Sequence, residues 1–190
     1  MTTPAAELDG RRARTVRTRA AILEAVLALL RGGDINPTAA EIARQAGVSL
    51  RSIAQHFPRR GDLFAAAAAL YQERPDSPEP SPTLPLAARL DAFLPERARE
   101  LERSRPMRAS AAQFAAEYPV VAAAIAGNAA RRRAQVERVF GPELAGRPDR
   151  LELVDLALGG RVWDALRERD LPPARAQALV RAMVGAALGV

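Results

Sequence analysis

The segment that decides the fold runs Thr38-Ala-Ala-Glu-Ile-Ala-Arg-Gln-Ala-Gly-Val-Ser-Leu-Arg-Ser-Ile-Ala-Gln-His-Phe57. Thr38, followed three residues later by Glu41, forms a capping box, in which each side chain satisfies a backbone N–H group at the start of a helix. Gly47 can adopt the left-handed conformation that ends this helix. Ser49 is a favourable N-cap for the next one. The segment therefore predicts two short helices joined by a tight turn.

The residues around the turn favour a helix-turn-helix arrangement of the predicted helices 39–46 and 50–56. Small Ala43 lets the helices approach closely, and Gly47 makes the turn. The angle between them is filled by apolar residues: Ile42, Ala46, Val48 and Ile53. The second helix offers a polar outer face: Arg51, Ser52 and Gln55. Such an exposed helix can enter the major groove of DNA, and a helical hairpin that binds nothing is the alternative.

The composition of the 190 residues favours helix. Alanine, leucine and arginine dominate, and no long stretch alternates apolar with polar residues as a strand would. The chain has no cysteine and one histidine, which excludes disulfides and thiolate sites and leaves little for a histidine-based metal site. We therefore predict an all-α protein with no catalytic residue, metal or cofactor.

Positive charge gathers toward the N-terminus. The net charge is +6, and residues 10–60 hold ten arginines against three acidic residues, a local balance of +7. This surplus is typical of a protein that binds a polyanion. The arginines within residues 11–19 suit either a solvated arm or an arm that enters the minor groove.

No apolar run approaches the roughly 18 residues of a membrane span, and the first ten residues lack the features of a secretory signal. We therefore expect a cytoplasmic protein with no membrane partner.

Four parts follow one another along the chain. A basic disordered arm is predicted over 1–14, a helix-turn-helix domain over 15–74, a proline-rich linker over 75–83, and a helical domain over 84–190. The helical periodicity and its breakers predict about nine helices. They cover residues 16–31, 39–46, 50–56, 60–72, 84–104, 106–117, 119–140, 149–169 and 173–188.

The N-terminal region resembles that of the TetR family of transcriptional regulators. The similarity runs from Arg19-Ala-Ala-Ile-Leu23 to His56-Phe-Pro-Arg-Arg-Gly-Asp-Leu63 and covers about the first 70 residues. In that family the helix after the turn reads bases, and the residues that open the helix before it and the fourth helix contact phosphate. The resemblance implies Thr38 and Arg60 as phosphate contacts. It implies a base-reading segment made of Ser49, Leu50, Arg51, Ser52, Gln55 and His56.

Three positions depart from the family pattern. Ala54 stands where the family usually has tyrosine, so the phosphate or thymine contact of that ring is missing. Arg59 replaces the usual hydroxyl residue before the fourth helix. Gly61 replaces a helix former and is expected to weaken the first turn of that helix.

The C-terminal region is also similar to the TetR family. Gly160-Arg-Val-Trp-Asp-Ala-Leu-Arg-Glu-Arg169 and the apolar-periodic helix that follows resemble its last two helices, which pair with their copies in a second subunit. The resemblance implies a homodimer interface made of Val162, Leu166, Leu179, Met183 and Ala186. An intramolecular core is the alternative. The geometry of DNA favours a dimer independently, because one short helix reads few base pairs.

The same resemblance implies a pocket for a small effector. Its candidate walls are the bulky residues Phe93, Met107, Phe114, Tyr118 and Trp163, for which plain core is the alternative. Few polar or charged side chains lie on these helix faces, so the effector is expected to be largely apolar. The resemblance as a whole implies a ligand-responsive homodimeric repressor of double-stranded DNA with a near-palindromic operator.

Other functions stay open at this point. The chain could be an activator, or a DNA-binding regulator with no small-molecule ligand. An enzyme would have to draw on Tyr118, Glu152 or Asp155, although no carboxylate cluster accompanies a nucleophile. A helical adaptor would only dimerise and would not retain DNA.

Overall fold

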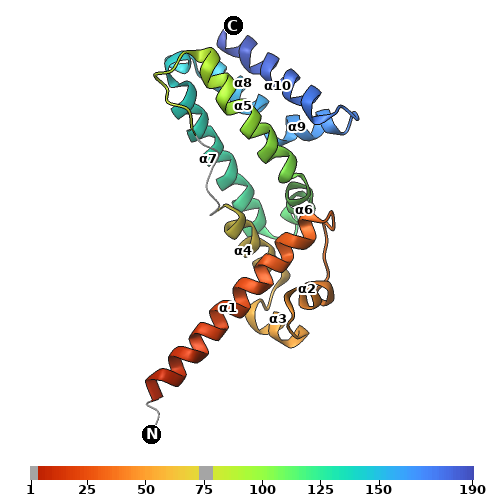
Figure 1. Cartoon of the computed structure of the whole chain (residues 1–190). Coiled ribbons are helices and arrows are strands. Elements are labelled where there is room, and N and C mark those ends of the chain that lie inside the picture. Colours follow the sequence, from red (N-terminus) through yellow and green to blue (C-terminus); the bar gives the residue numbers. More distant parts are fainter. Residues whose placement is uncertain (1–3, 73–78) are drawn as a thin grey trace. The chain divides into compact units, whose positions relative to one another are not determined.

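The computed structural model describes residues 4–72 and 79–190, and in these residues it contains ten helices and no strand (Figure 1). The prediction of an all-α fold is confirmed. The predicted helix over 149–169 is wrong, because it is two helices, α8 (Pro148–Ala157) and α9 (Gly160–Arg167). Gly159 lies between them in an extended conformation, as the N-cap of α9. The glycine pair at 159–160 breaks the helix and explains why ten helices are present rather than nine.

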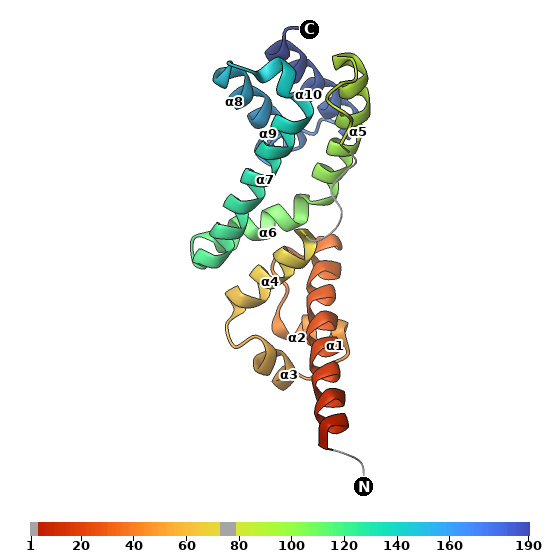
Figure 2. The same ribbon diagram turned by 90° about the vertical axis from the view of Figure 1, so that its left-hand side faces the viewer.

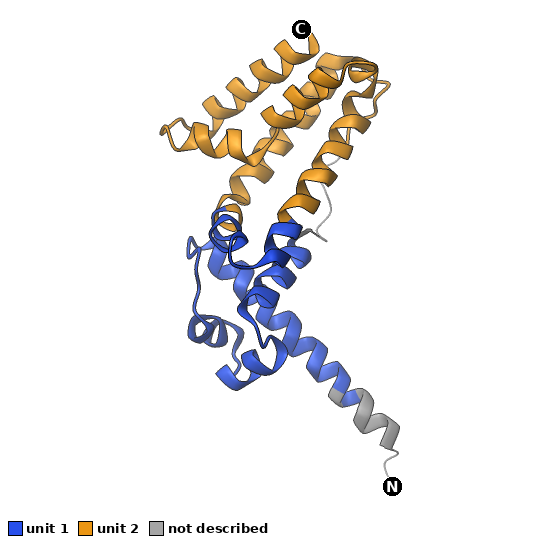
Figure 3. Ribbon diagram, turned by 180° about the vertical axis from the view of Figure 1, so that it is seen from behind, with its two compact units in different colours: residues 1–74, 109–124 blue, residues 75–108, 125–190 orange. Residues whose placement is uncertain are grey.

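The chain divides into two compact units (Figure 3). The first contains residues 1–74 and 109–124, and the second contains residues 75–108 and 125–190. The helices α1 to α4 and the segment 109–124 thus belong to the same unit, whereas the sequence predicted that segment to be part of the C-terminal domain. Most of the linker predicted over 75–83 lies outside the described residues.

The first unit is built around α1 (Pro4–Arg31), against which α2 (Ala39–Ala46) and α4 (Arg60–Gln72) pack (Figure 2). The short helix α3 (Leu50–His56) follows α2 in the chain and packs on it. The buried face of α1 begins only at Ile22 and continues through Val26, Leu27 and Leu30. These residues recur at helical spacing, which explains why this half of α1 packs on its neighbours.

The start of α1 corrects the prediction of a disordered arm over residues 1–14. The helix begins at Pro4, so residues 4–14 form its first turns; residues 1–3 lie outside the described residues. Proline is tolerated in the first turn of a helix, and the alanines and arginines that follow have high helix propensity. Apolar periodicity, the signal used for the prediction, reports burial and is absent where a helix projects into solvent.

The second unit surrounds one hydrophobic core. It contains α5 (Leu86–Arg103), the start of α6 (Arg105–Ala115), most of α7 (Pro119–Leu144), α8, α9 and α10 (Pro173–Leu188). The rings of Phe93 and Phe140 meet edge to face with centroids 5.7 Å apart. Around them lie further fully buried side chains, including Val136, Val154, Leu158, Trp163 and Val184. Among the described helices, none has the length and apolarity needed to cross a bilayer.

Two buried arginines join the helices of the second unit. Arg89 donates to the backbone oxygens of Leu84 (2.9 Å) and Val139 (2.8 Å) and to both carboxylate oxygens of Glu143. Arg97 donates twice to the carbonyl of Leu158 at the end of α8, at 3.1 and 2.9 Å. A buried guanidinium is costly unless its N–H groups are satisfied, and these contacts satisfy them.

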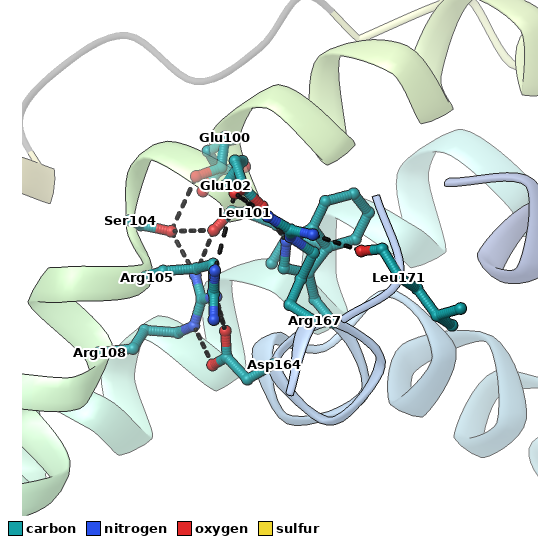
Figure 4. Close-up of polar contacts among 10 residues, drawn as sticks. Glu100, Leu101, Glu102, Ser104, Arg105, Arg108, Asp164, Arg167 and Leu171 are labelled. Atoms are coloured by element: carbon teal, nitrogen blue, oxygen red, sulfur yellow. Dashed lines mark hydrogen bonds and ion pairs between the residues drawn. The ribbon is translucent and has the colours of Figure 1, made fainter. Parts of the chain in front are cut away.

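A network of charged side chains links α5, α6 and α9 (Figure 4). Arg108 makes a bidentate contact with Asp164, at 2.9 and 2.6 Å. Glu102 accepts from the indole N–H of Trp163 (2.8 Å) and from Arg167 (3.2 Å). Burial alone would raise the pKa of Glu102, but these hydrogen bonds outweigh it and hold the pKa below its ordinary value. The network therefore consists of paired charges that position Trp163.

Candidate nucleic-acid interface

The capping box predicted at the start of α2 is present. The N–H of Thr38 donates to Glu41 Oε2 (2.8 Å), and the N–H of Glu41 donates to the Thr38 hydroxyl (3.3 Å). The same hydroxyl donates to Glu41 Oε2 at 2.6 Å. Hydrogen bonds from the Thr38 side chain and backbone hold the pKa of Glu41 below its ordinary value. The hydroxyl hydrogen of Thr38 is thus directed at Glu41.

The turn between α2 and α3 also has the predicted geometry. Gly47 adopts the left-handed conformation, with φ of 66°, and Val48 N–H donates to the carbonyl of Ala43 at 3.0 Å. A side chain at residue 47 would be strained in this conformation. Ser49 then caps α3, because its hydroxyl accepts from the N–H of Ser52 at 3.1 Å.

The residues of α3 divide into three groups around its axis. Only Ile53 is buried within the helix. Since successive residues are rotated by about 100°, Arg51 and Gln55 point away from the side that Ile53 buries. Leu50 and Ala54 lie to one side of that pair, and all four of these outward residues are exposed. The prediction that this helix presents side chains to solvent holds for Leu50, Arg51 and Gln55.

Ser52 and His56 lie on the opposite side of α3 and are half-buried. The Ser52 hydroxyl is paired with that of Ser49, at 2.9 Å. The backbone oxygen of His56 accepts from Arg19, whose guanidinium lies 4.3 Å from the centre of the Phe57 ring. These two residues are therefore less available for contacts with a partner than the sequence pattern suggested.

Arg60, predicted to contact phosphate, is anchored within its own unit. Its Nη2 donates to the carbonyl of Pro37 (3.1 Å) and to the side chain of Asn36. Its guanidinium also lies over the rings of Phe64 and Phe114, 5.4 and 5.0 Å from their centres. Arg60 thus joins the start of α4 to the loop before α2 while remaining exposed overall. The phosphate contact itself stays a prediction.

The structure gives a packing reason for glycine at residue 61, which the sequence alone did not show. A Cβ atom at this residue would lie 2.3 Å from Cδ1 and 2.7 Å from Cγ of Tyr118. The Tyr118 ring therefore packs directly on the first turn of α4. Phe114 lies 4.6 Å from Phe64, between ring centres, and 6.0 Å from Tyr118. These aromatic contacts hold segment 109–124 against α4.

The contact between Gly61 and Tyr118 predicts that Gly61→Ala changes the free energy of unfolding in opposite directions, depending on whether Tyr118 is present. Gly61→Ala in the wild-type chain should lower the free energy of unfolding by about 1 to 2 kcal/mol, because the clash exceeds the gain in helix propensity. In a Tyr118→Ala background the same change should raise it by up to about 1 kcal/mol. Urea denaturation of the four proteins measures both values. Equal effects in the two backgrounds would show that the ring does not rest on Gly61.

The predicted pocket residues are divided between the two units. Phe114 and Tyr118 belong to the first unit, and Phe93, Met107 and Trp163 belong to the second. Phe93 and Trp163 are fully buried members of the core. The gap beside Trp163, which Leu94, Arg97 and Leu101 also border, has no room for a water molecule. The pocket stays a prediction without an open cavity at this place.

The predicted dimer residues differ in exposure. Leu166 is buried in the core, and Val162 and Leu179 pack against it. Met183 and Ala186 on α10 are exposed. Leu153 and Leu156 of α8 are also exposed, by 55% and 59%. Their signal in the sequence is the run Leu151-Glu-Leu-Val-Asp-Leu-Ala-Leu158, which holds more apolar residues than one helix face can bury.

Two of the three residues considered for an enzyme site, Glu152 and Asp155, form ion pairs with arginines. Asp155 binds Arg132 through two hydrogen bonds, of 2.9 and 3.1 Å, and Glu152 binds Arg133 at 2.6 Å. Within residues 4–72 and 79–190, no three His, Asp or Glu side chains are grouped as metal ligands.

Comparison of the chain with protein-family models, with curated proteins and with solved structures found no match.

Proposed function

We propose that this protein is a DNA-binding transcriptional regulator that acts as a homodimer and reads a near-palindromic operator with α3. The observation that carries the proposal is the outward presentation of α3. A capped seven-residue helix buries Ile53 and leaves Leu50, Arg51 and Gln55 exposed. A helix held in this way at the surface of a basic module suits insertion into the major groove.

Positive charge on the surface of the first unit supports binding to a polyanion. Arg12, Arg14 and Arg17 are exposed along the projecting half of α1, and Arg44 is exposed on α2. Arginine side chains neutralise phosphates and release counterions, which strengthens binding at low salt. These arginines would position the module on the duplex, and the residues of α3 would supply the sequence preference.

A surface on α8 and α10 supports the dimer. Arg150 at the start of α8 donates to the carbonyl of Leu188 at the end of α10 (3.1 Å), and the two helices pack on each other. Leu153 and Leu156 are exposed on α8, and Met183 on α10 is 42% exposed. Three large apolar side chains on adjacent helices are costly to leave in water. A second copy of the chain would cover them.

This dimer surface yields a prediction for Leu156→Glu. Placing a carboxylate from each subunit near a two-fold axis should weaken dimerisation about 30-fold, roughly 2 kcal/mol. Since Leu156 is exposed, the fold should be preserved. Sedimentation equilibrium measures the dissociation constant, with Val120→Glu as the control because Val120 is an exposed apolar residue on α7. Unchanged dimerisation of Leu156→Glu, or equal weakening in the control, would place the interface elsewhere.

The small, largely apolar effector is a separate part of the proposal. The closed gap beside Trp163 favours the alternative, a regulator that responds to no small molecule, because no preformed cavity exists there. Thermal shift over a panel of apolar compounds tests the effector, since a ligand of the folded state raises the melting temperature. Compounds that raise it should also release the bound DNA.

Selection of bound sequences from random duplex DNA tests the proposed function. We expect enrichment of a near-palindromic sequence, with retention that falls steeply as salt rises. The matched control is the variant Arg51→Ala/Gln55→Ala, whose changes lie on the exposed face of α3. It should retain salt-dependent binding and lose the enrichment. Absence of any retention by the wild-type chain at low salt would end the proposal.

A further inference from the structure

An open groove borders α3 on the side of Leu50 and Ala54. It has a volume of about 250 Å³. Its walls come from α3 through Leu50 and Ala54, from the start of α2 through Pro37 and Ala39, and from the start of α4 through Pro58 and Arg60. All of these residues belong to the first unit. The groove therefore adjoins the surface that is proposed to face DNA.

Ala54 contributes a single methyl group to the lining of the groove. Buried Ile42 and Ile53 line it as well, so this part of the groove is apolar. Leu50, one helical turn before Ala54 and 55% exposed, forms the rim on the same face of α3. Together Leu50 and Ala54 present an apolar edge of α3 directly beside the polar pair Arg51 and Gln55.

The chemistry of this edge discriminates between bases. In the major groove, guanine, adenine and cytosine present hydrogen-bond donors or acceptors, and thymine alone adds an apolar group, its 5-methyl. A donor or acceptor placed against Leu50 and Ala54 would lose its hydrogen bonds to water and gain none from these side chains. A methyl group placed there would gain an apolar contact with Leu50 and Ala54, and it has no hydrogen bond to water to lose.

We propose that Leu50 and Ala54 select a thymine in each half-site by receiving its 5-methyl group at the edge of this groove. The inference rests on the proposed function, because it names a base that the proposed reading helix recognises. Arg51 suits guanine, with which arginine forms two hydrogen bonds. The selected thymine therefore lies within one or two base pairs of the base that Arg51 contacts.

Replacing thymine by uracil tests the inference, because it removes the methyl group and leaves base pairing unchanged. The wild-type chain and the sequence obtained by selection are used, with each thymine replaced in turn and the dissociation constant measured by fluorescence anisotropy. We expect one position in each half-site where loss of the methyl weakens binding about fourfold. Replacement in both half-sites should weaken it about 15-fold.

Two variants assign the effect to the groove. Leu50→Gln should bind the thymine and uracil duplexes equally, because the apolar rim is gone. Ile125→Gln, which makes the same kind of change at an exposed apolar residue of α7, should keep the fourfold ratio. Sequence-selective binding with no thymine position sensitive to uracil, or an unchanged ratio in Leu50→Gln, would overturn the inference and leave the proposed function standing. A wild-type chain with no sequence preference would overturn both.

Discussion

Replacing Arg51 by alanine is expected to weaken binding to the selected DNA sequence about 1000-fold. Arg51 is exposed and points away from the side of α3 that packs on the module. A bidentate contact between arginine and guanine is worth about 2 kcal/mol. A dimer loses it twice, or about 4 kcal/mol in all. Fluorescence anisotropy with the selected duplex and with an unrelated duplex measures the change.

The control for this prediction removes the same charge from a neighbouring helix. Arg44 is exposed in the last turn of α2, outside the reading helix. Arg44→Ala should weaken binding to the selected and unrelated sequences alike, because a phosphate contact carries no sequence information. Arg51→Ala should instead bring the two affinities close together. If both variants weakened all sequences equally, Arg51 would contact only the DNA backbone.

Arg89→Ala should lower the free energy of unfolding by about 4 kcal/mol, because it removes one partner of a buried ion pair. The Arg89 side chain is only 3% exposed, and its loss leaves the Glu143 carboxylate and two backbone carbonyls without their donor. The control is Arg181→Ala, which breaks an exposed ion pair with Asp91 and should cost less than about 1 kcal/mol. Urea denaturation at neutral pH measures both. Similar losses for the two variants would mean that burial of Arg89 adds nothing.

The same ion pair predicts a dependence on pH. Hydrogen bonds from Arg89 hold the pKa of Glu143 below its ordinary value in the folded chain. A carboxyl group whose pKa is lowered on folding stabilises the protein above its unfolded pKa, and this stabilisation is lost as pH falls through the folded pKa. The wild-type chain should therefore lose this contribution below about pH 4. Arg89→Ala should show a smaller loss over that range.

The segment that contains α2, α3 and the turn between them shows how far local signals reach. The capping box at Thr38, the left-handed Gly47 and the Ser49 cap all rest on contacts within a few residues of the chain, and each was predicted correctly. The ends of α2 and α3 follow from these signals. The exposure of Arg51 and Gln55 also follows, because helical periodicity places them opposite Ile53.

Contacts between distant residues were not accessible in this way. From the sequence, Gly61 was expected only to weaken the first turn of its helix. In the structure, the ring of Tyr118, 57 residues later in the chain, occupies the space that a Cβ atom at residue 61 would need. The assignment of 109–124 to the first unit depends on the same packing. The helical start of α1 was missed for a different reason, because its residues have helix propensity without an apolar face.

The sequence by itself determined the helical class, the caps of α2 and α3 with the turn between them, and the outward residues of α3. Each depends on backbone preferences or on hydrogen bonds within one or two helical turns. Tertiary structure alone decided which arginines are buried, where Tyr118 rests, and that a groove borders α3 at Ala54. Those features depend on which surfaces meet and how completely they fill the space between them, and a list of local preferences does not contain that information.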